Sequence, residues 1–369
     1  MPESRAELRA IVDALVGDCA ASWDLAGQLP NDVLRKLGSN GLLCAEVPKE
    51  YGGLGLGSQD GGAFTAYVGS LCSSLRSVMT SQGMVAWTIQ RMGTQQQRYE
   101  YLRRLTGGEL ASVAFSEPEA GSDLSTMETE IRWDGDEVVL DGKKVWTTAA
   151  LYADLIVVVG VQGQAGAAVI VPAGAAGVTV ERVANPSGCR AAGHANLRFE
   201  SVRLPADAVL GGGGQPLSWL FTTALAYGRI SVAWGCVGIL RACLSAAATH
   251  AATRRQFGKP LAEHQLIAHH LAELYTAEQV ATRACEHASR CWDAGSPELV
   301  VATVLAKYVS ARGAARGAAA AAQIMGSAGA QDGHVVARAY RDAKLMEIIE
   351  GSNEICQLIL AQHAVTTAR

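Results

Sequence analysis

Residues 341–355 of the chain read RDAKLMEIIEGSNEI, and the rest of the sequence can be interpreted outward from this stretch. Apolar Leu345, Ile348 and Ile349 recur at i, i+3 and i+4, which predicts an amphipathic helix up to residue 349. Gly351 then interrupts the helical pattern, and the serine after it can cap a second helix. The same apolar spacing resumes in that second helix, at Ile355, Leu358 and Ile359.

Glu350 falls at the predicted break between these two helices, with apolar neighbours before it. A carboxylate held at such a place loses water, so its pKa rises and it becomes a stronger base. The alternative is a solvated Glu at a helix end, because acidic side chains usually remain exposed. Residues elsewhere in the chain have to decide between these two interpretations.

Length and composition indicate an ordinary soluble protein of two or three domains. The chain has 369 residues, of which 49% are hydrophobic and 18% charged, with a net charge of −4. With this mild acidity, no basic surface for nucleic acid is expected. The sequence contains no uninterrupted run of eighteen apolar residues, so it gives no signal for a membrane span. The polar N-terminus does not resemble a signal peptide. We therefore expect a cytoplasmic protein with neither a nucleic-acid nor a membrane partner.

The cysteine, histidine and serine patterns argue against several other kinds of site. The nine cysteines are scattered without a CxxC pair, which indicates reduced, mostly buried thiols. His264, His269 and His270 lack the HExxH spacing, so we expect no metal site there. Ser116 and Ser122 have no GxSxG setting, which disfavours a serine hydrolase.

The hydrophobic period changes twice along the chain. Helical spacing dominates residues 1–111, and short β-rich runs separated by turns follow over residues 112–212, including an Asp134-Gly135-Asp136 hairpin signal. Helical spacing returns over residues 213–369, with long helices and short connections that favour a bundle. The expected fold is thus mainly α with a β-domain: an N-terminal helical domain, a middle β-barrel and a C-terminal four-helix bundle.

Two segments next to the β-domain could hold a ligand. Residues 114–123, AFSEPEAGSD, place small and hydroxyl residues beside backbone N–H groups, which can hold a polar or anionic ligand, although a turn-rich crossover has the same composition. Trp146-Thr147-Thr148 places an indole beside two hydroxyls, which suits an aromatic ligand with one packed face and one hydrogen-bonded edge. A Trp that covers the end of the barrel is the alternative.

Two further segments interrupt the C-terminal helical region. Residues 253–260, TRRQFGKP, offer Arg254 to a phosphate, although a solvated basic turn is the alternative. Residues 323–329, QIMGSAG, form a small-residue loop after a helix, where a backbone can approach a pyrophosphate closely. Each signal is weak when taken alone.

Taken in order, these segments resemble the acyl-CoA dehydrogenase flavoprotein family over nearly the whole chain. The matching segments are Pro48 to Gly55 (PKEYGGLG), Gly93 to Gln97 (GTQQQ), Ser116 to Pro118 with Ala120 to Asp123, Lys144 to Thr148 (KVWTT), Phe199 with Val202 to Pro205, Arg254 with Gln256 to Gly258, and Arg341 to Ala343 with Glu350 to Ser352. The resemblance implies the three-domain fold given above, FAD as the cofactor, and a homotetramer or homodimer in which two subunits touch each flavin.

The resemblance also implies roles for individual residues. Glu350 falls on the catalytic base, and Ser122, Arg229 and Gly351 fall on positions near the acyl thioester. Contacts to the flavin ring are implied for Phe115, Ser116, Ser122, Trp146, Thr147 and Thr148. Contacts to the rest of the cofactor, some of them with a neighbouring subunit's FAD, are implied for Arg254, Phe257, Gln265, Gln323, Met325, Gly326, Ser327, Ser352 and Glu354.

The implied reaction is α,β-dehydrogenation of a short acyl thioester carried by CoA or by an acyl carrier protein. Glu350 would remove the α proton while the β hydrogen leaves as hydride to flavin N5, and the Glu350 backbone N–H would stabilise the enolate oxygen. The electron acceptor is not indicated. An oxidase that uses oxygen on the same fold is the alternative function, and a DNA-binding relative is disfavoured by the net charge of −4.

Several positions depart from the family pattern. Ala149 replaces the Asn after Trp-x-Thr, Ile349 replaces the aromatic residue that often precedes the Glu, Ser327 replaces the second Gly of the cofactor loop, and Ala330 replaces the aromatic residue after it. These changes concern the acyl pocket and the carrier of the acyl group. The chain is small and divergent, and its many Arg, Ala and Gly residues with few Lys indicate a GC-rich genome. In these respects it is similar to the acyl-carrier-protein dehydrogenases of polyketide clusters, for example those that make methoxymalonyl extender units. Arg103-Arg104 is a faint candidate for docking the carrier.

Overall fold

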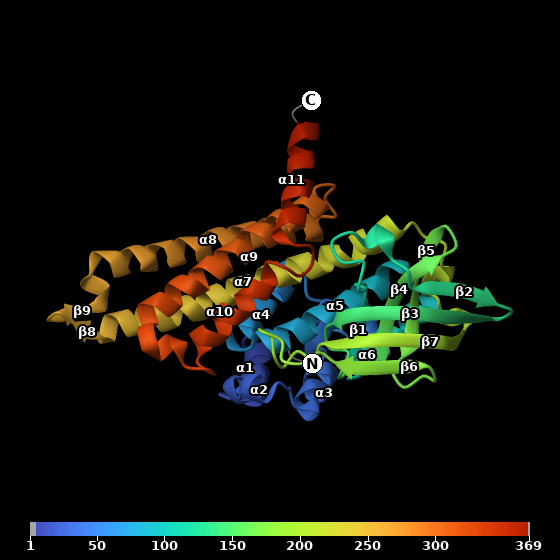
Figure 1. Cartoon of the computed structure of the whole chain (residues 1–369), viewed down its shortest axis with the longest axis horizontal. Helices are drawn as coiled ribbons and strands as arrows, with labels where there is room; N and C mark the ends of the chain where they lie inside the picture. Colours follow the sequence, from blue (N-terminus) through green and yellow to red (C-terminus); the bar gives the residue numbers. More distant parts are fainter. Residues whose placement is uncertain (1–4, 368–369) are drawn as a thin grey trace.

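Helices make up the first part of the chain in a computed structural model that describes residues 5–367 (Figure 1). They are α1 (Arg5–Val16), α2 (Ala20–Ala26), α3 (Asn31–Ser39), α4 (Ser58–Leu71), α5 (Ser73–Met92) and α6 (Gln95–Thr106). Thr94 and Gln97 form a capping box that fixes the start of α6. Almost every residue of α5 is buried, so this helix has neighbours on all sides. Helix α5 contacts several residues of the candidate site, among them Thr148 and Gly228.

A curled sheet follows the first helices. Its strands are β1 (Ala111–Ala114), β2 (Glu130–Asp134), β3 (Glu137–Thr147), β4 (Leu155–Gln162), β5 (Ala165–Pro172), β6 (Val178–Arg182) and β7 (Ala195–Pro205). They pair in the order β1-β4-β2-β3-β7-β6, and β5 also pairs with β4. The predicted hairpin is confirmed, because Asp134 pairs with Glu137 across the two-residue turn. Valines, leucines and isoleucines fill the inside of the curl.

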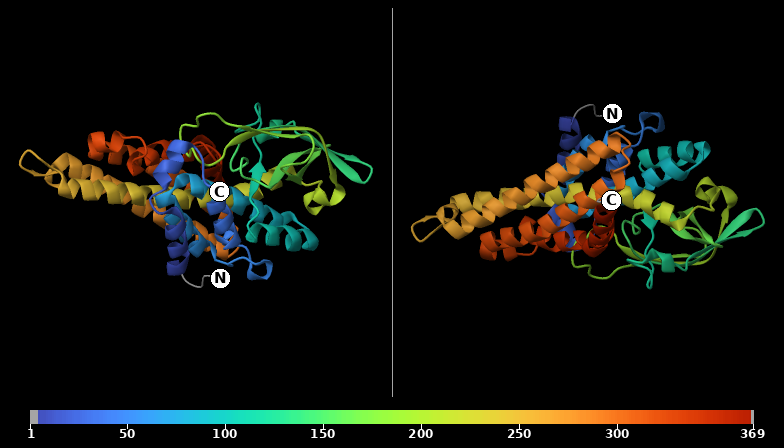
Figure 2. Two further views of the ribbon diagram at one scale, coloured as in Figure 1. Left: turned by 90° about the horizontal axis from the view of Figure 1, so that it is seen from below. Right: turned by 90° about the horizontal axis from the view of Figure 1, so that it is seen from above.

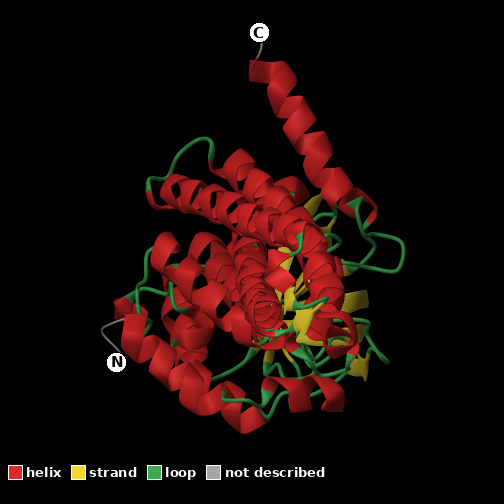
Figure 3. Ribbon diagram, turned by 90° about the vertical axis from the view of Figure 1, so that its left-hand side faces the viewer, coloured by secondary structure: helices red, strands yellow, loops and turns green. Residues whose placement is uncertain are grey.

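Long helices form the last part of the chain. These are α7 (Leu217–Thr253), α8 (Gln265–Asp293), α9 (Leu299–Met325), α10 (Val335–Met346) and α11 (Asn353–Thr367), with a small hairpin of β8 (Arg255–Gln256) and β9 (Lys259–Pro260). Helices α7 to α10 pack around one core rich in alanine. The hairpin and the curled sheet lie at opposite ends of the molecule in both views of Figure 2. Helix α11 projects away from the other helices (Figure 3).

This arrangement confirms the expected fold class of helices, β-domain and helical bundle. Short 3-10 helices connect its elements at Leu42–Cys44, Lys49–Tyr51, Leu124–Thr126, Ala206–Ala208, Leu210–Gly212, Leu261–Glu263 and Gly326–Ala330. Helix α7 is long and apolar enough to pass a membrane-span test, with a mean hydropathy of 1.6 over its best window. Because 72% of that window is buried inside the molecule, α7 has the surroundings of a core helix.

The C-terminal stretch folds as two helices separated by a break, with one correction. Helix α10 ends at Met346, three residues before the predicted end at Ile349, and α11 begins at Asn353. The prediction was wrong there because a side chain from a distant helix forms hydrogen bonds with the backbone after Met346. Lys307 on α9 donates to the carbonyl oxygens of Glu347 (3.4 Å) and Gly351 (2.7 Å), which favours a turn over further helix.

Candidate active site

Glu350 lies in this turn with an unusual backbone conformation. Its φ is 55° and that of Gly351 is 84°, so two successive residues occupy the left-handed region. A residue with a side chain is strained there and stays only where its surroundings hold it. Two buried cations do so: Arg229 Nε donates to the Glu350 carbonyl oxygen (3.1 Å) and Lys307 Nζ to that of Gly351. The turn thus fixes the direction of the Glu350 side chain.

The Glu350 carboxylate is withdrawn from water. Its Oε2 is buried and has no hydrogen-bond partner within residues 5–367. It lies against the backbone of α7 at Gly228, where an added Cβ would stand 2.0 Å from Oε2. Desolvation raises the pKa of Glu350 to about 7, although the charges of Arg229, Lys307 and Arg76 act to lower it. A carboxylate with this pKa is suited to take a proton near neutral pH.

The three cations that act on Glu350 are themselves buried. Arg229 on α7 is 6% exposed, Arg76 on α5 is 1% exposed and Lys307 is fully buried. Desolvation lowers the pKa of both Arg229 and Lys307. The resemblance predicted Arg229 but missed Arg76 and Lys307. The available sequence signal was a charged residue among small and apolar neighbours along the chain, which alone gives no location.

Trp146, Thr147 and Thr148 lie where the end of β3 meets α5. Trp146 has a φ of 54° and is 53% exposed, with its ring 5.8 Å from that of His194. The Thr148 hydroxyl and His194 Nδ1 are 3.2 Å apart, and Ser81 on α5 donates to the Thr148 carbonyl oxygen (3.1 Å). Desolvation lowers the pKa of His194 to about 4, so this imidazole is neutral at pH 7. Sequence reasoning did not select His194.

A buried ion pair shapes the segment that carries Phe115 and Ser116. Lys144 Nζ donates to Glu117 Oε1 (2.8 Å) and to the Phe115 carbonyl oxygen (2.9 Å). Desolvation acts to raise the pKa of Glu117, but a bond from the Glu128 N–H and the Lys144 partner hold it below its ordinary value. The Ser116 carbonyl oxygen also accepts a hydrogen bond from the backbone N–H of Val145, the residue before Trp146 (2.8 Å). These contacts join the two predicted flavin segments into one structure.

The residues around Trp146 and those around Phe115 fit the flavin that the resemblance implies. Thr147 Oγ1 and His194 Nε2 are buried without partners in the described chain, as is Glu350 Oε2. A flavin ring has a flat apolar face for the exposed Trp146 and a polar edge for unpaired donors and acceptors. Helix α5 connects these flavin segments with the site of Glu350. It contacts Thr148 through Ser81, and its Met84 lies against Gly228, next to the Glu350 carboxylate.

The remaining predicted residues lie in four other places. Ser122 is exposed on the segment after β1, while Ser352 accepts the Ile355 N–H at the start of α11 and Glu354 is exposed beside it. Arg254, Phe257 and Gln265 lie on or beside the β8–β9 hairpin, far from the sheet (Figure 1). The fourth set ends α9: Met325 is buried, and the exposed members are Gln323, Gly326 and Ser327. Phe257 is 95% exposed, which leaves its ring available to a partner.

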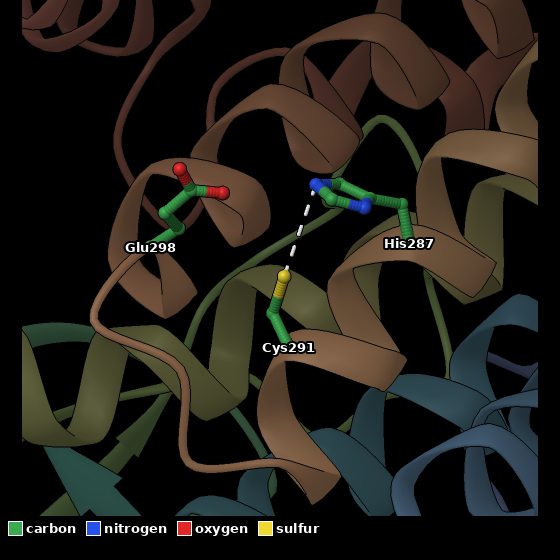
Figure 4. A group of neighbouring side chains, drawn as sticks. All are labelled: His287, Cys291 and Glu298. Atoms are coloured by element: carbon green, nitrogen blue, oxygen red, sulfur yellow. Dashed lines mark hydrogen bonds between the residues drawn. The ribbon is translucent and has the colours of Figure 1, made fainter.

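A separate group of potential metal ligands joins α8 to the start of α9 (Figure 4). His287 Nε2 and Cys291 Sγ are 3.8 Å apart, and a Glu298 oxygen completes a set whose ligand atoms lie within 4.8 Å of one another. Sequence reasoning missed this group because Glu298 is brought in by the turn between the helices.

Family models match nearly the whole chain. The N-terminal domain of acyl-CoA dehydrogenase matches residues 3–109, the middle domain residues 112–202 and the C-terminal domain residues 219–365. A probable acyl-CoA dehydrogenase, YngJ of Bacillus subtilis, is 33% identical over 92% of this chain and 91% of its own length. The human mitochondrial short-chain specific acyl-CoA dehydrogenase is 31% identical over 95% of this chain and 86% of its own length.

Solved structures give the same result. FkbI, described as acting in biosynthesis of the methoxymalonyl extender unit of the polyketide Fk520, is 63% identical, with a TM-score of 0.93 over 97% of this chain and 99% of its own. Butyryl-CoA dehydrogenase from Megasphaera elsdenii is 25% identical, with a TM-score of 0.93 over 99% of both chains. A glutaryl-CoA dehydrogenase from Mycobacterium smegmatis, also 25% identical, was solved with FADH2. The chain belongs to the acyl-CoA dehydrogenase family and is an FAD-dependent oxidoreductase of acyl thioesters.

Proposed function

We propose that the chain catalyses α,β-dehydrogenation of a short acyl thioester with Glu350 as the base. The observation that carries this proposal is the Glu350 carboxylate, whose Oε2 is buried, unpaired and beside three cations that do not hydrogen-bond to it. Because its pKa is about 7, the ionised form is available near neutral pH and retains a strong affinity for a proton. A base that formed an ion pair with Arg229 would be weaker.

The turn also supplies a donor for the thioester. The Glu350 N–H forms no hydrogen bond within residues 5–367, so it can donate to a carbonyl oxygen that gains charge as the α proton leaves. Arg229 and Lys307 hold the neighbouring carbonyl oxygens and therefore keep this N–H in place. FAD, when bound over Trp146 and Thr148, supplies the hydride acceptor. The chain's own residues thus remove the proton and stabilise the oxygen.

Packing between α5 and α7 supports a short acyl group. Tyr227, the residue before Gly228, places its hydroxyl where a Cβ on Gly83 would be only 2.2 Å away. The tyrosine ring is buried and lies edge-on to that of Trp292, with 6.0 Å between the ring centroids. The Tyr227 side chain therefore occupies the gap between α5 and α7, next to the Gly228 that lies against Glu350.

The identity to FkbI supports an acyl group attached to a carrier protein in polyketide assembly. We further propose a cytoplasmic homotetramer, in which Arg254, Phe257, Gln265 and the Gln323 to Ser327 segment contact a neighbouring subunit's FAD. The exposure of Phe257 at the hairpin tip, remote from the sheet, supports that assignment. The domain boundaries near residues 111 and 212 remain predictions of the same kind.

Anaerobic flavin bleaching tests the function. Wild-type protein loaded with FAD should bleach with a short saturated acyl thioester, whereas Glu350→Gln should retain FAD and bleach at least about 1,000-fold more slowly, as expected for loss of a proton-transfer group. Equal rates in both proteins would contradict the assignment. When the same acyl group is supplied on CoA and on a carrier protein, the flavin should bleach faster with the carrier protein. Repeating the reaction in air tests the oxidase alternative.

A further inference from the structure

The end of α8 and the start of α9 bring three metal-ligating side chains together outside the site of Glu350 (Figure 4). His287 and Cys291 are four residues apart on α8, which places them one turn apart on the same face of the helix. Glu298 follows the turn between the helices, and its carboxylate faces the other two side chains. An imidazole nitrogen, a thiolate sulfur and a carboxylate oxygen are the three kinds of ligand that Zn²⁺ takes from proteins.

Backbone hydrogen bonds give the turn between α8 and α9 a defined shape. The Ser296 N–H donates to the Cys291 carbonyl oxygen (2.9 Å) and the Gly295 N–H to that of Trp292 (3.0 Å), which together form a Schellman motif. Gly295 has the left-handed backbone (φ 59°) that this motif requires. The Ser296 hydroxyl then accepts the Glu298 N–H (3.2 Å). The turn therefore returns Glu298 to the level of Cys291.

The last turn of α8 is also fixed by its neighbours. Asp293 Oδ1 accepts the Ser58 N–H (2.7 Å), and the rings of Trp292 and Trp87 have centroids 4.5 Å apart. Cys291 is 8% exposed, so packing sets the position of its sulfur. A ligand held in place in this way loses little freedom when it binds an ion.

The three side chains have few other contacts. His287 Nε2 and Cys291 Sγ are 3.8 Å apart, and sulfur is a weak hydrogen-bonding group. Glu298 begins α9, but its side chain does not cap that helix and has no hydrogen bond or ion pair within residues 5–367. A negative charge at a helix start also favours the helix dipole. That role requires neither the histidine nor the cysteine.

The spacing of the ligand atoms suits one small cation. Bonds of about 2.3 Å to sulfur and about 2.1 Å to nitrogen, at a tetrahedral angle, separate the two ligand atoms by about 3.6 Å. The 3.8 Å between Cys291 and His287 is close to this value, and all three ligand atoms lie within 4.8 Å of one another. The exposed Glu298 side chain can rotate to close a gap of about 1 Å. Sulfur and nitrogen ligands favour zinc over calcium or magnesium, which prefer oxygen.

We propose that His287, Cys291 and Glu298 bind one Zn²⁺ ion, which joins the end of α8 to the start of α9. The Cys291 thiol releases its proton to solvent as the ion binds. Three protein ligands leave a fourth position for water, which the exposed His287 and Glu298 allow to enter. This site is separate from the candidate active site, and the proposal does not rest on the dehydrogenation.

Calorimetry with Zn²⁺ tests the proposal on FAD-loaded protein that has first been freed of metal with a chelator. The wild-type protein should bind one ion per chain with a Kd of about 1 μM or lower. Cys291→Ser should weaken binding at least about 100-fold because the thiolate is lost. Cys19→Ser, which changes an exposed thiol in the first helices, should bind as the wild type does. A wild-type Kd above about 100 μM, or equal Kd values for Cys291→Ser and wild type, would overturn the proposal.

Further substitutions identify the other two ligands. His287→Gln and Glu298→Gln should each weaken Zn²⁺ binding about 10-fold or more. The competing site is the pair His269 and His270 at the other end of α8, whose rings are 5.9 Å apart. His269→Gln should leave the Kd unchanged. Loss of binding in that variant, with binding retained in His287→Gln and Glu298→Gln, would assign the ion to the histidine pair and refute the proposal.

Co²⁺ in place of Zn²⁺ reports on the ligand atoms directly. A tetrahedral site with a thiolate gives intense d–d bands at wavelengths longer than those that the flavin absorbs. These bands should appear with the wild-type protein and be absent with Cys291→Ser, while circular dichroism and flavin absorbance show that the variant is folded and loaded. Weak bands typical of six-coordinate Co²⁺ in the wild-type protein would contradict the proposed ligand set.

Discussion

Replacing Glu350 by Gln should change how the stability of the protein depends on pH. The pKa of Glu350 is about 7 in the folded chain against an ordinary value of 4.5, because desolvation outweighs the charges of Arg229, Lys307 and Arg76. Between these two values the unfolded chain has lost the proton and the folded chain still holds it. The folded state therefore binds more protons, and the free energy of unfolding falls as pH rises from about 4.5 to about 7.

The size of the effect follows from the difference between the two pKa values. At about 1.4 kcal/mol for each pH unit, the wild-type protein should lose about 3 kcal/mol over this range through Glu350. Glutamine does not titrate, so the variant should not show this loss. His194 has the opposite sign, because its pKa of about 4 lies below the ordinary 6.5 and its contribution is lost as pH falls. Comparing the two proteins cancels His194, since both contain it.

Urea unfolding of the FAD-loaded proteins at pH values from 4 to 8 measures the effect. The stability of Glu350→Gln relative to wild type should rise by about 3 kcal/mol across the titration and then stay level above pH 7. The rate of flavin bleaching in the wild type should rise through the same pH range, because the ionised carboxylate is the base. Parallel stability curves for the two proteins would show that Glu350 is solvated in the folded state and would refute the reasoning.

Three other substitutions test separate parts of the site. Gly228→Ala places a Cβ 2.0 Å from the present position of Glu350 Oε2, so thioester-dependent bleaching should fall about 100-fold while FAD absorbance is retained. Lys144→Met leaves Glu117 without its buried partner and should lower the free energy of unfolding by about 3 to 5 kcal/mol in urea titrations, and adding Glu117→Gln should restore part of the loss. Phe257→Asp should lower both the oligomer mass in light scattering and the FAD content, whereas unchanged values would remove the hairpin from the proposed subunit interface.

The sequence predicted the fold class and the position of the helix break because these depend on local patterns. Apolar spacing separated helices from strands, and Gly351 marked the interruption after α10. The positions of the three buried cations around Glu350 depend instead on how separate helices pack together. Arg76, Arg229 and Lys307 come from α5, α7 and α9, and periodicity within one helix cannot show which partner it meets. The resemblance supplied Arg229, and the other two became visible once the helices were packed together.

His194 and the early end of α10 were missed for the same physical reason. His194 gains its place from contact with Trp146 and Thr148, which lie more than forty residues earlier in the chain. Helix α10 stops at Met346, and Lys307 donates to the Glu347 and Gly351 carbonyl oxygens in the turn that follows. Both results depend on contacts between distant segments, whereas helix propensity and spacing describe neighbours along the chain.

The way in which the cations hold the turn explains how Glu350 can remain a base. Arg229 donates to the carbonyl oxygen of Glu350 itself and Lys307 to those of Glu347 and Gly351, and neither cation hydrogen-bonds to the carboxylate. Direct ion pairs would fix the same turn but would lower the pKa toward that of a surface Glu, which removes the affinity for the α proton. Burial without cations would raise the pKa further and keep the carboxyl protonated at neutral pH. Charges close enough to be felt, yet bonded elsewhere, place the pKa between these limits and leave Oε2 free for the substrate.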